Sequence, residues 1–196
     1  MFLHVTQGEI GVIYERNEAH WRWLASHGAS PCVILYIRQV LKGRKRTTLT
    51  HVHTGNDIKH LEQQLRQILE LEPAGVVSME EAGITHLMSF TEVIKGGDQR
   101  TLMIKLTQTG TRRDVEALAE KMFGEDTIVT EMDSGGVRVD HLTGEVVPMT
   151  DEDAMGLCAG ILLKTAMTRD PLLQRGSAPF FIRTGYTHEE GALLGT

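Results

Sequence analysis

Cys32 is the residue whose chemistry and position first suggest a reactive site. It follows a turn-forming stretch with Gly28, Ser30 and Pro31, and it precedes the apolar run from Val33 to Ile37. A side chain at such a junction can project into a cleft while the strand behind it stays rigid. Cysteine is a strong nucleophile once it has lost its proton, and a neighbouring imidazole promotes that loss. The alternative is an inert thiol in the core, which is common for free cysteines.

His51 is the base that predicted strand pairing would bring to this thiol. Residues 33–37 and 47–52 are rich in β-branched and apolar side chains and predict two strands, and the basic stretch 42–46 between them predicts an exposed turn. In an antiparallel hairpin, position 32 at the start of one strand would lie beside position 51 at the end of the other. The spacing alone fits equally a core thiol and a surface histidine.

Metal binding is the rival chemistry in the same segment. His51 and His53 stand two positions apart, so a strand would place both on one face, where they could bind zinc together with His60 or Asp57. A pair without a fixed third ligand is a weak signal, and a metal on His51 would compete with its use as a base. We therefore expect no metal and no cofactor.

Length and composition describe one globular domain. The chain has 196 residues, 41% of them hydrophobic, and a formal net charge of -6, which argues against a general nucleic-acid binder. No stretch approaches the roughly 20 apolar residues of a membrane span, and no classical secretory signal begins the chain. Cys32 and Cys158 are the two cysteines, and we expect Cys158 to be a buried thiol. We expect a cytoplasmic protein, or an effector exported without a classical signal peptide.

The pattern of strands and helices predicts the fold class. Strands are expected at 5–14 (with a turn at 7–9), 33–37, 47–52, 84–94, 101–107, 127–131, 136–141 and 145–147, and a short turn or helix at 17–24. Amphipathic helices are expected from Ile58 to near Pro73, capped by Asn56 or Asp57, and around 114–123. This order predicts a layered α/β (α+β) fold with a mixed, mostly antiparallel sheet and two or three packed helices.

The last quarter of the chain differs in composition. A third helix is expected at 151–168 with Thr150 as its cap, followed by a loop-like tail from Arg169. We expect residues 1–150 to form the main domain and residues 151–196 to pack on it as a C-terminal helix and loop.

Six short segments between residues 1 and 147 follow one another in the order of a known family. They are VTQGEIGV (5–12), SPCV (30–33), THV (50–52), RDVEALAEKMF (113–123), TEMDSGG (130–136) and the closing stretch 137–147. They resemble CheD, the family of chemoreceptor glutamine deamidases, and its distant relatives, the N-terminal asparagine amidohydrolases.

This resemblance implies a cysteine hydrolase on a layered fold. By matching position, Cys32 is the nucleophile, His51 is the base, and Ser26 is the third group that orients the imidazole. Ser30 is the competing third residue. The substrate implied is a protein with an exposed glutamine or asparagine side chain. Neither a nucleic acid nor a membrane is implied as a partner, and the oligomeric state is left open.

Four residues near these positions are candidates for substrate binding. They are Gln7, Ser30, His53 and Trp21, with Trp23 as a second aromatic residue for the same lip. Two other functions use the same residues. One is a catalytically silent protein-binding module with this fold, which Pro31 before the cysteine would suit. The other is a cysteine-dependent peptidase or transglutaminase.

Overall fold

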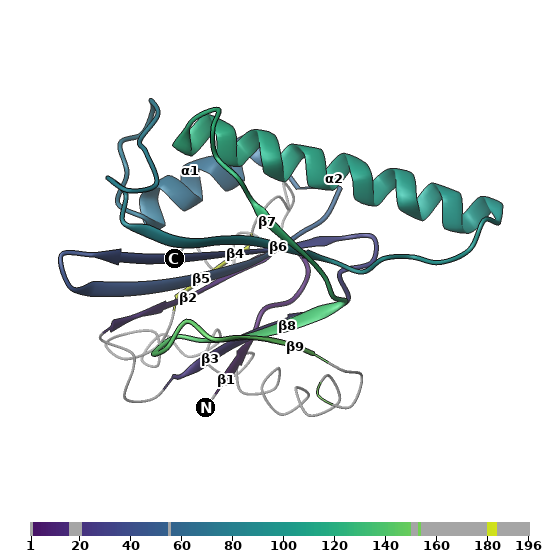
Figure 1. Cartoon of the computed structure of the whole chain (residues 1–196), viewed down its shortest axis with the longest axis horizontal. Helices are drawn as coiled ribbons and strands as arrows, with labels where there is room; N and C mark the ends of the chain where they lie inside the picture. Colours follow the sequence, from purple (N-terminus) through teal and green to yellow (C-terminus); the bar gives the residue numbers. More distant parts are fainter. Residues whose placement is uncertain (1, 16–20, 55, 150–152, 154–179, 184–196) are drawn as a thin grey trace.

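The computed structural model describes residues 2–15, 21–54, 56–149, 153 and 180–183. Within them, two helices cover one face of a six-stranded sheet, and a four-stranded sheet packs on its other face (Figure 1). The elements are β1 (Phe2–His4), β2 (Glu9–Tyr14), β3 (Trp23–His27), β4 (Val33–Leu41), β5 (Arg44–Val52), α1 (Ile58–Ile68), β6 (Ile84–Thr91), α2 (Gln99–Phe123), β7 (Thr130–Asp133), β8 (Gly136–Asp140), β9 (Val146–Pro148) and β10 (Phe180–Arg183). The predicted layered fold with a mixed, mostly antiparallel arrangement of strands is confirmed.

The larger sheet has the order β10-β2-β5-β4-β6-β7, and the smaller has the order β1-β3-β8-β9. All neighbours are antiparallel except β6 with β7 and β1 with β3. The predicted hairpin is β4 and β5, each longer than expected, and its turn consists of Lys42 and Gly43 with φ angles of 52° and 79°. Positive φ at both positions matches the right-handed twist of the flanking strands.

Alternation along these strands divides the interior into two apolar cores. Val33, Leu35 and Ile37 face the helices, whereas Ile34 and Tyr36 face the smaller sheet. Because both faces of the larger sheet are covered, its central strands are apolar on both sides. The second core lies between the two sheets, which we call the inter-sheet layer, and it ends beside the candidate site.

Helix α1 begins where the sequence predicted and ends earlier. Asp57, rather than Asn56, is its cap, because the Asp57 side chain accepts hydrogen bonds from the backbone N–H groups of Lys59 and His60. The helix ends at Ile68, before the expected stop near Pro73.

The predicted strand 101–107 is wrong, because these residues belong to the long helix α2. Asp98 caps this helix by accepting the N–H of Thr101. The first half of α2 projects beyond the sheet (Figure 1), and Leu102 and Leu106 are 50% and 68% exposed. Since this half buries no apolar stripe, the sequence lacks the helical spacing that packing would have imposed.

Two further expectations on the N- and C-terminal parts need correction. The segment predicted as a turn or helix at 17–24 reaches into strand β3, which begins at Trp23. In the tail predicted as a loop, residues 180–183 form β10 and pair antiparallel with β2. Apart from Asp153, the predicted helix 151–168, with its cap Thr150 and with Cys158, lies outside the described residues. No helix in the described part of the chain is long and apolar enough to cross a membrane.

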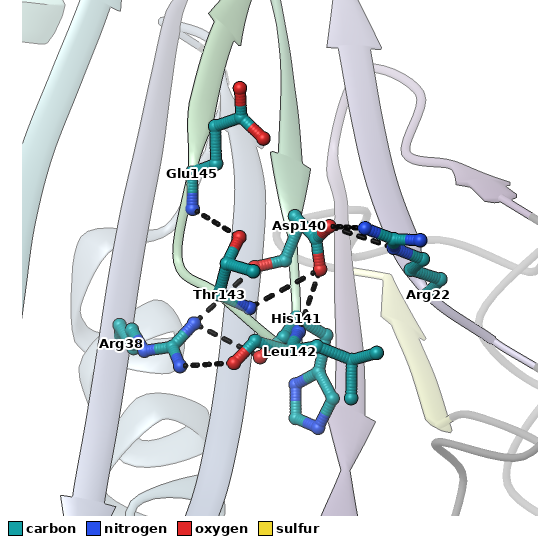
Figure 2. Close-up of polar contacts among 7 residues, drawn as sticks. All are labelled: Arg22, Arg38, Asp140, His141, Leu142, Thr143 and Glu145. Atoms are coloured by element: carbon teal, nitrogen blue, oxygen red, sulfur yellow. Dashed lines mark hydrogen bonds and ion pairs between the residues drawn. The ribbon is translucent and has the colours of Figure 1, made fainter.

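A buried carboxylate and a buried arginine hold the turn after β8, away from the candidate site. Asp140, at the end of β8, accepts two contacts of 2.7 Å from the Arg22 guanidinium and one of 2.8 Å from the N–H of Leu142. Arg38 of β4 donates to the carbonyls of Asp140, His141 and Leu142 at 3.0–3.3 Å (Figure 2). The turn after β8 is therefore held by charged groups from both sheets.

We expect Asp140→Asn to lower the free energy of unfolding by about 1–3 kcal/mol at pH 7. Burial alone would raise the pKa of Asp140, but hydrogen bonds from Arg22 and from the following backbone lower it below its ordinary value. A carboxyl with a lowered pKa stabilises the fold above its unfolded pKa and loses that effect as the pH falls through its folded pKa. Denaturant titrations should therefore show the deficit at pH 7 and a smaller one at pH 3, with exposed Asp126→Asn as the control. An equal deficit at both pH values would contradict this account.

Candidate functional site

Cys32, His51 and Ser26 lie at one end of the inter-sheet layer, and each is on the face of its strand that points into that layer. Each stands two positions beyond a side chain of that core, and therefore shares its face. The pairs are Cys32 with Ile34, His51 with Leu49, and Ser26 with Leu24. The apolar core is thus followed at this end by a polar group of side chains from both sheets.

The register of the β4–β5 hairpin sets how Cys32 and His51 lie. Ile34 pairs with His51 and Val33 with Val52, so the same register places Cys32 opposite His53 and diagonal to His51. Diagonal neighbours on one face are about 7–8 Å apart between Cα atoms, within reach of a long side chain. The hairpin therefore brings the two predicted residues to one face, as expected, but one step out of direct opposition.

A hydrogen bond of 3.0 Å between Ser26 Oγ and His51 Nδ1 connects the two sheets at this site. Ser26 Oγ also donates to the carbonyl of Val5 at 2.7 Å. A serine hydroxyl has one proton, so while it donates to Val5 it must accept from His51. Nδ1 of His51 therefore carries the proton, and Nε2 carries the lone pair.

Nε2 of His51 is buried and has no hydrogen-bond partner among the described residues. The ring is 3% exposed. Its pKa is lowered to about 4, mainly by burial, with His27 and His53 acting in the same direction. The Glu9 carboxylate and the Gly28 backbone act oppositely without offsetting this. His51 is thus neutral at pH 7, and its basic nitrogen is buried rather than open to solvent.

Cys32 is more enclosed than the sequence suggested. Its side chain is 3% exposed rather than open to a cleft, and burial raises the pKa of its thiol. No hydrogen bond within the described residues joins its sulfur to the imidazole of His51. The pair therefore rests as a neutral thiol and a neutral imidazole under a covering layer.

The other predicted site residues fall into different places. Gln7 is exposed in the turn before β2, and the N–H of its neighbour Gly8 donates to the carbonyl of His51 at 2.9 Å. Ser30 is half-buried in the turn before Cys32 and, in the described structure, makes no hydrogen bond to His51, so the geometry favours Ser26 as the third group.

His53 and Trp21 differ in their exposure. His53 is half-buried, and burial lowers the pKa of its ring. Trp21 is 4% exposed and packs in the inter-sheet core, so in this structure it presents almost no surface to a substrate. A tryptophan buries a large area, and this core takes it up. Trp23 is half-exposed and stacks instead with Arg138, whose guanidinium carbon lies 4.7 Å from the ring centroid.

Glu9 is a residue near the site that the sequence analysis did not select. It is 8% exposed, and its Oε2 accepts the N–H of Thr6 at 3.0 Å. The β2–β5 register, in which Ile10 pairs with Thr50, places Glu9 opposite His51. The sequence offered one signal for Glu9, namely a charged residue at a strand position that alternation turns inward. Charged side chains are rarely buried unless they are paired.

The zinc site considered from the sequence does not form in the described residues. Asp57 caps α1 and His60 lies on that helix, and no group of three or more potential ligands comes together in the described part of the chain. A cavity of about 380 Å³ lies at the opposite end of the β4–β5 hairpin, beside Arg46 and Glu70, and none of the predicted site residues lines it.

No protein-family model matches the chain, and no curated protein matches it.

We expect the neutral His51 ring to be protonated on Nδ1 at pH 7, since Ser26 can only accept there. Long-range ¹H–¹⁵N spectra of labelled protein should show this tautomer, and Ser26→Ala should weaken the preference and lower the free energy of unfolding by about 1 kcal/mol. Ser30→Ala is the matched control, because the Ser30 hydroxyl makes no hydrogen bond to His51 in the described structure. A ring protonated on Nε2 in the wild type would contradict the assignment.

The lowered pKa of His51 predicts how stability depends on pH. A histidine whose pKa is about 4 when folded and 6.5 when unfolded binds more protons in the unfolded state, so stability is lost as the pH falls through this window. Between pH 7 and 4 the wild type should lose about 3 kcal/mol more than His51→Gln. Urea titrations at both pH values measure this, with His60→Gln as the control. Parallel losses in wild type and His51→Gln would show that His51 titrates normally.

Proposed function

We propose that the chain is a cysteine-dependent protein amidohydrolase that converts a glutamine or asparagine side-chain amide to a carboxylate. The observation that carries this proposal is the Ser26–His51 hydrogen bond of 3.0 Å, which assigns the ring proton to Nδ1 and the basic lone pair to Nε2. A nucleophile, a base and a group that orients the base are the parts such a reaction needs. The resemblance to the CheD family supports the same roles for Cys32, His51 and Ser26.

The reaction proceeds in two halves. His51 Nε2 takes the thiol proton, and the Cys32 sulfur attacks the carboxamide carbon. The tetrahedral intermediate collapses when His51 returns the proton to the leaving nitrogen, so ammonia departs and a thioester remains. Water then attacks the thioester with His51 as base, and the thiol is restored as the carboxylic acid leaves. The substrate side chain gains one negative charge, and no metal or cofactor takes part.

The resting geometry requires a change when substrate binds. A 3% exposed thiol cannot meet a carboxamide until the covering layer moves. The turn of Ser30 and Pro31 is the described segment best placed to yield, because it is half-buried and directly precedes Cys32 in the chain. Removal of one such cover would let the thiol and Nε2 approach each other as the substrate enters.

The partner in this proposal is a protein that presents an exposed glutamine or asparagine. The CheD resemblance implies a bacterial chemoreceptor as the default substrate. A foreign protein attacked by an exported effector is the other substrate class. Reaction with an amine or cleavage of a peptide bond would use the same nucleophile, so the products distinguish deamidation from transglutaminase and peptidase chemistry.

A second function is favoured by a specific observation. The thiol of Cys32 is enclosed, its pKa is raised by burial, and no described hydrogen bond joins it to His51. These are properties of a structural cysteine. They suit a protein-binding module that keeps the fold without the reaction.

Intact-mass analysis tests the amidohydrolase. Incubation with the cytoplasmic fragment of a chemoreceptor should add about one mass unit per converted amide and release ammonia, with wild type but not with Cys32→Ala. His51→Gln should abolish the gain, and Ser26→Ala should reduce the rate by about 10²-fold or more, as expected for loss of the group that orients a base. A mass gain that persists in Cys32→Ala would show that Cys32 is not the nucleophile. Cleaved products would indicate a peptidase, and cross-linked products would indicate a transglutaminase.

Alkylation of Cys32 separates the enzyme from the silent module. The resting thiol is enclosed and its pKa is raised, so it should react with iodoacetamide more slowly than a free cysteine peptide. If the protein is the enzyme, adding the chemoreceptor fragment at pH 6 should move the cover and give Cys32 a rate advantage over the protein alone. Peptide mapping counts Cys32 separately from Cys158, and His51→Gln should remove the advantage. An alkylation rate at pH 6 that the fragment leaves unchanged would favour the binding module.

A further inference from the structure

We propose that Glu9 is a positioning residue that stabilises His51 in its protonated form during the reaction. This inference rests on the proposed function, since only a base that becomes a cation needs such a partner. Glu9 belongs to strand β2 of the larger sheet, and His51 to the adjacent strand β5.

Strand pairing places the two side chains on one face. The pairs Ile10–Thr50 and Gly11–Leu49 extend to Glu9 opposite His51. The N–H of Gly8 also bonds to the His51 carbonyl, at 2.9 Å, so Gly8 and Glu9 together face one residue of β5. Gly8 has a φ of 78°. When a glycine in this conformation and the residue after it both lie opposite a single residue of the neighbouring strand, the two form a β-bulge. Bulges redirect side chains, and this one lies beside the base.

The face shared by Glu9 and His51 is the one toward the smaller sheet. Ile13 of β2 and Leu49 of β5 lie in the inter-sheet core, and alternation assigns Glu9 and His51 to the same side. The carboxylate is 8% exposed, and the N–H of Thr6 holds one of its oxygens at 3.0 Å. A carboxylate fixed and shielded from water acts more strongly on a neighbouring charge than an exposed one.

The other titratable groups around His51 oppose its protonation. His27 of β3 and His53 of β5 both disfavour a charge on the ring, and His4 of β1 stacks on His27 with ring centroids 4.8 Å apart. Glu9 acts in the opposite direction. Ser26 occupies Nδ1 of His51 with a neutral oxygen, so the site has no hydrogen-bonded carboxylate on the imidazole in the way a Ser-His-Asp triad has. Glu9 supplies that charge from the neighbouring strand.

The test replaces the charge and keeps the shape. In Glu9→Gln the amide oxygen can still accept from Thr6, whereas the negative charge is gone. Histidine spectra of Cys32→Ala protein recorded across pH 3 to 6 should show a His51 midpoint near pH 4, and the added Glu9→Gln change should lower that midpoint by up to about one pH unit. Glu9→Asp keeps the charge and should retain most of the protonation. Exposed Glu145→Gln is the control for a lost surface charge.

The same variants with Cys32 intact report on the reaction. Glu9→Gln should lower the deamidation rate and the alkylation rate of Cys32 about tenfold at pH 7, with an unchanged melting temperature. Equal protonation of His51 with and without the Glu9 charge would overturn the inference, whether or not the protein is an enzyme. If Glu9→Gln does not fold at pH 4, the same comparison at pH 5 decides the point, since His51 should be about a tenth protonated with the Glu9 charge and about a hundredth without it. A shifted His51 in a protein that releases no ammonia would support the coupling and overturn the proposed function instead.

Discussion

The hydroxyl of Ser26 is the point on which the geometry of the site depends. It donates its one proton to the Val5 carbonyl within the smaller sheet and accepts a hydrogen bond from His51 in the larger one. The packing of the two sheets therefore determines which nitrogen of the imidazole carries the proton. Neither sheet alone could orient this ring. Because the interface on the core side of Ser26 is apolar and closely packed, the polar contact can exist only at the end of the inter-sheet layer, where His51 and Cys32 follow the last core residues.

Burial gives this site its electrostatic character. An enclosed imidazole and an enclosed thiol both favour their neutral forms, so the resting pair stores no separated charge. In the proposed reaction this pair becomes reactive only when a substrate changes its surroundings, and the Glu9 carboxylate and the Gly28 backbone are described groups that favour the charged form of His51. The same burial that supports the alternative of a silent module is compatible with an enzyme whose reactive state forms on binding.

The hairpin and α1 could be predicted because their signals are local. The β-rich runs around Lys42 and Gly43, and the apolar spacing that follows Asp57, depend on residues close together in the sequence. The first half of α2 could not, because it packs against little and carries no apolar stripe. Strand β10 was missed for another reason. Its position depends on pairing with β2, which lies far away in the sequence. The short segment 180–183 carries no periodic pattern that would have predicted a strand.

The amino-acid sequence by itself determined which side chains could react, and it placed Cys32 and His51 on one hairpin, because a short turn fixes the register of the strands it joins. Only the tertiary structure decided that Trp21 packs in the core, that Ser26 rather than Ser30 meets the imidazole, and that Glu9 lies opposite it. Those relations join residues from different strands and different sheets. They arise from how the layers pack, and local propensity carries no information about them.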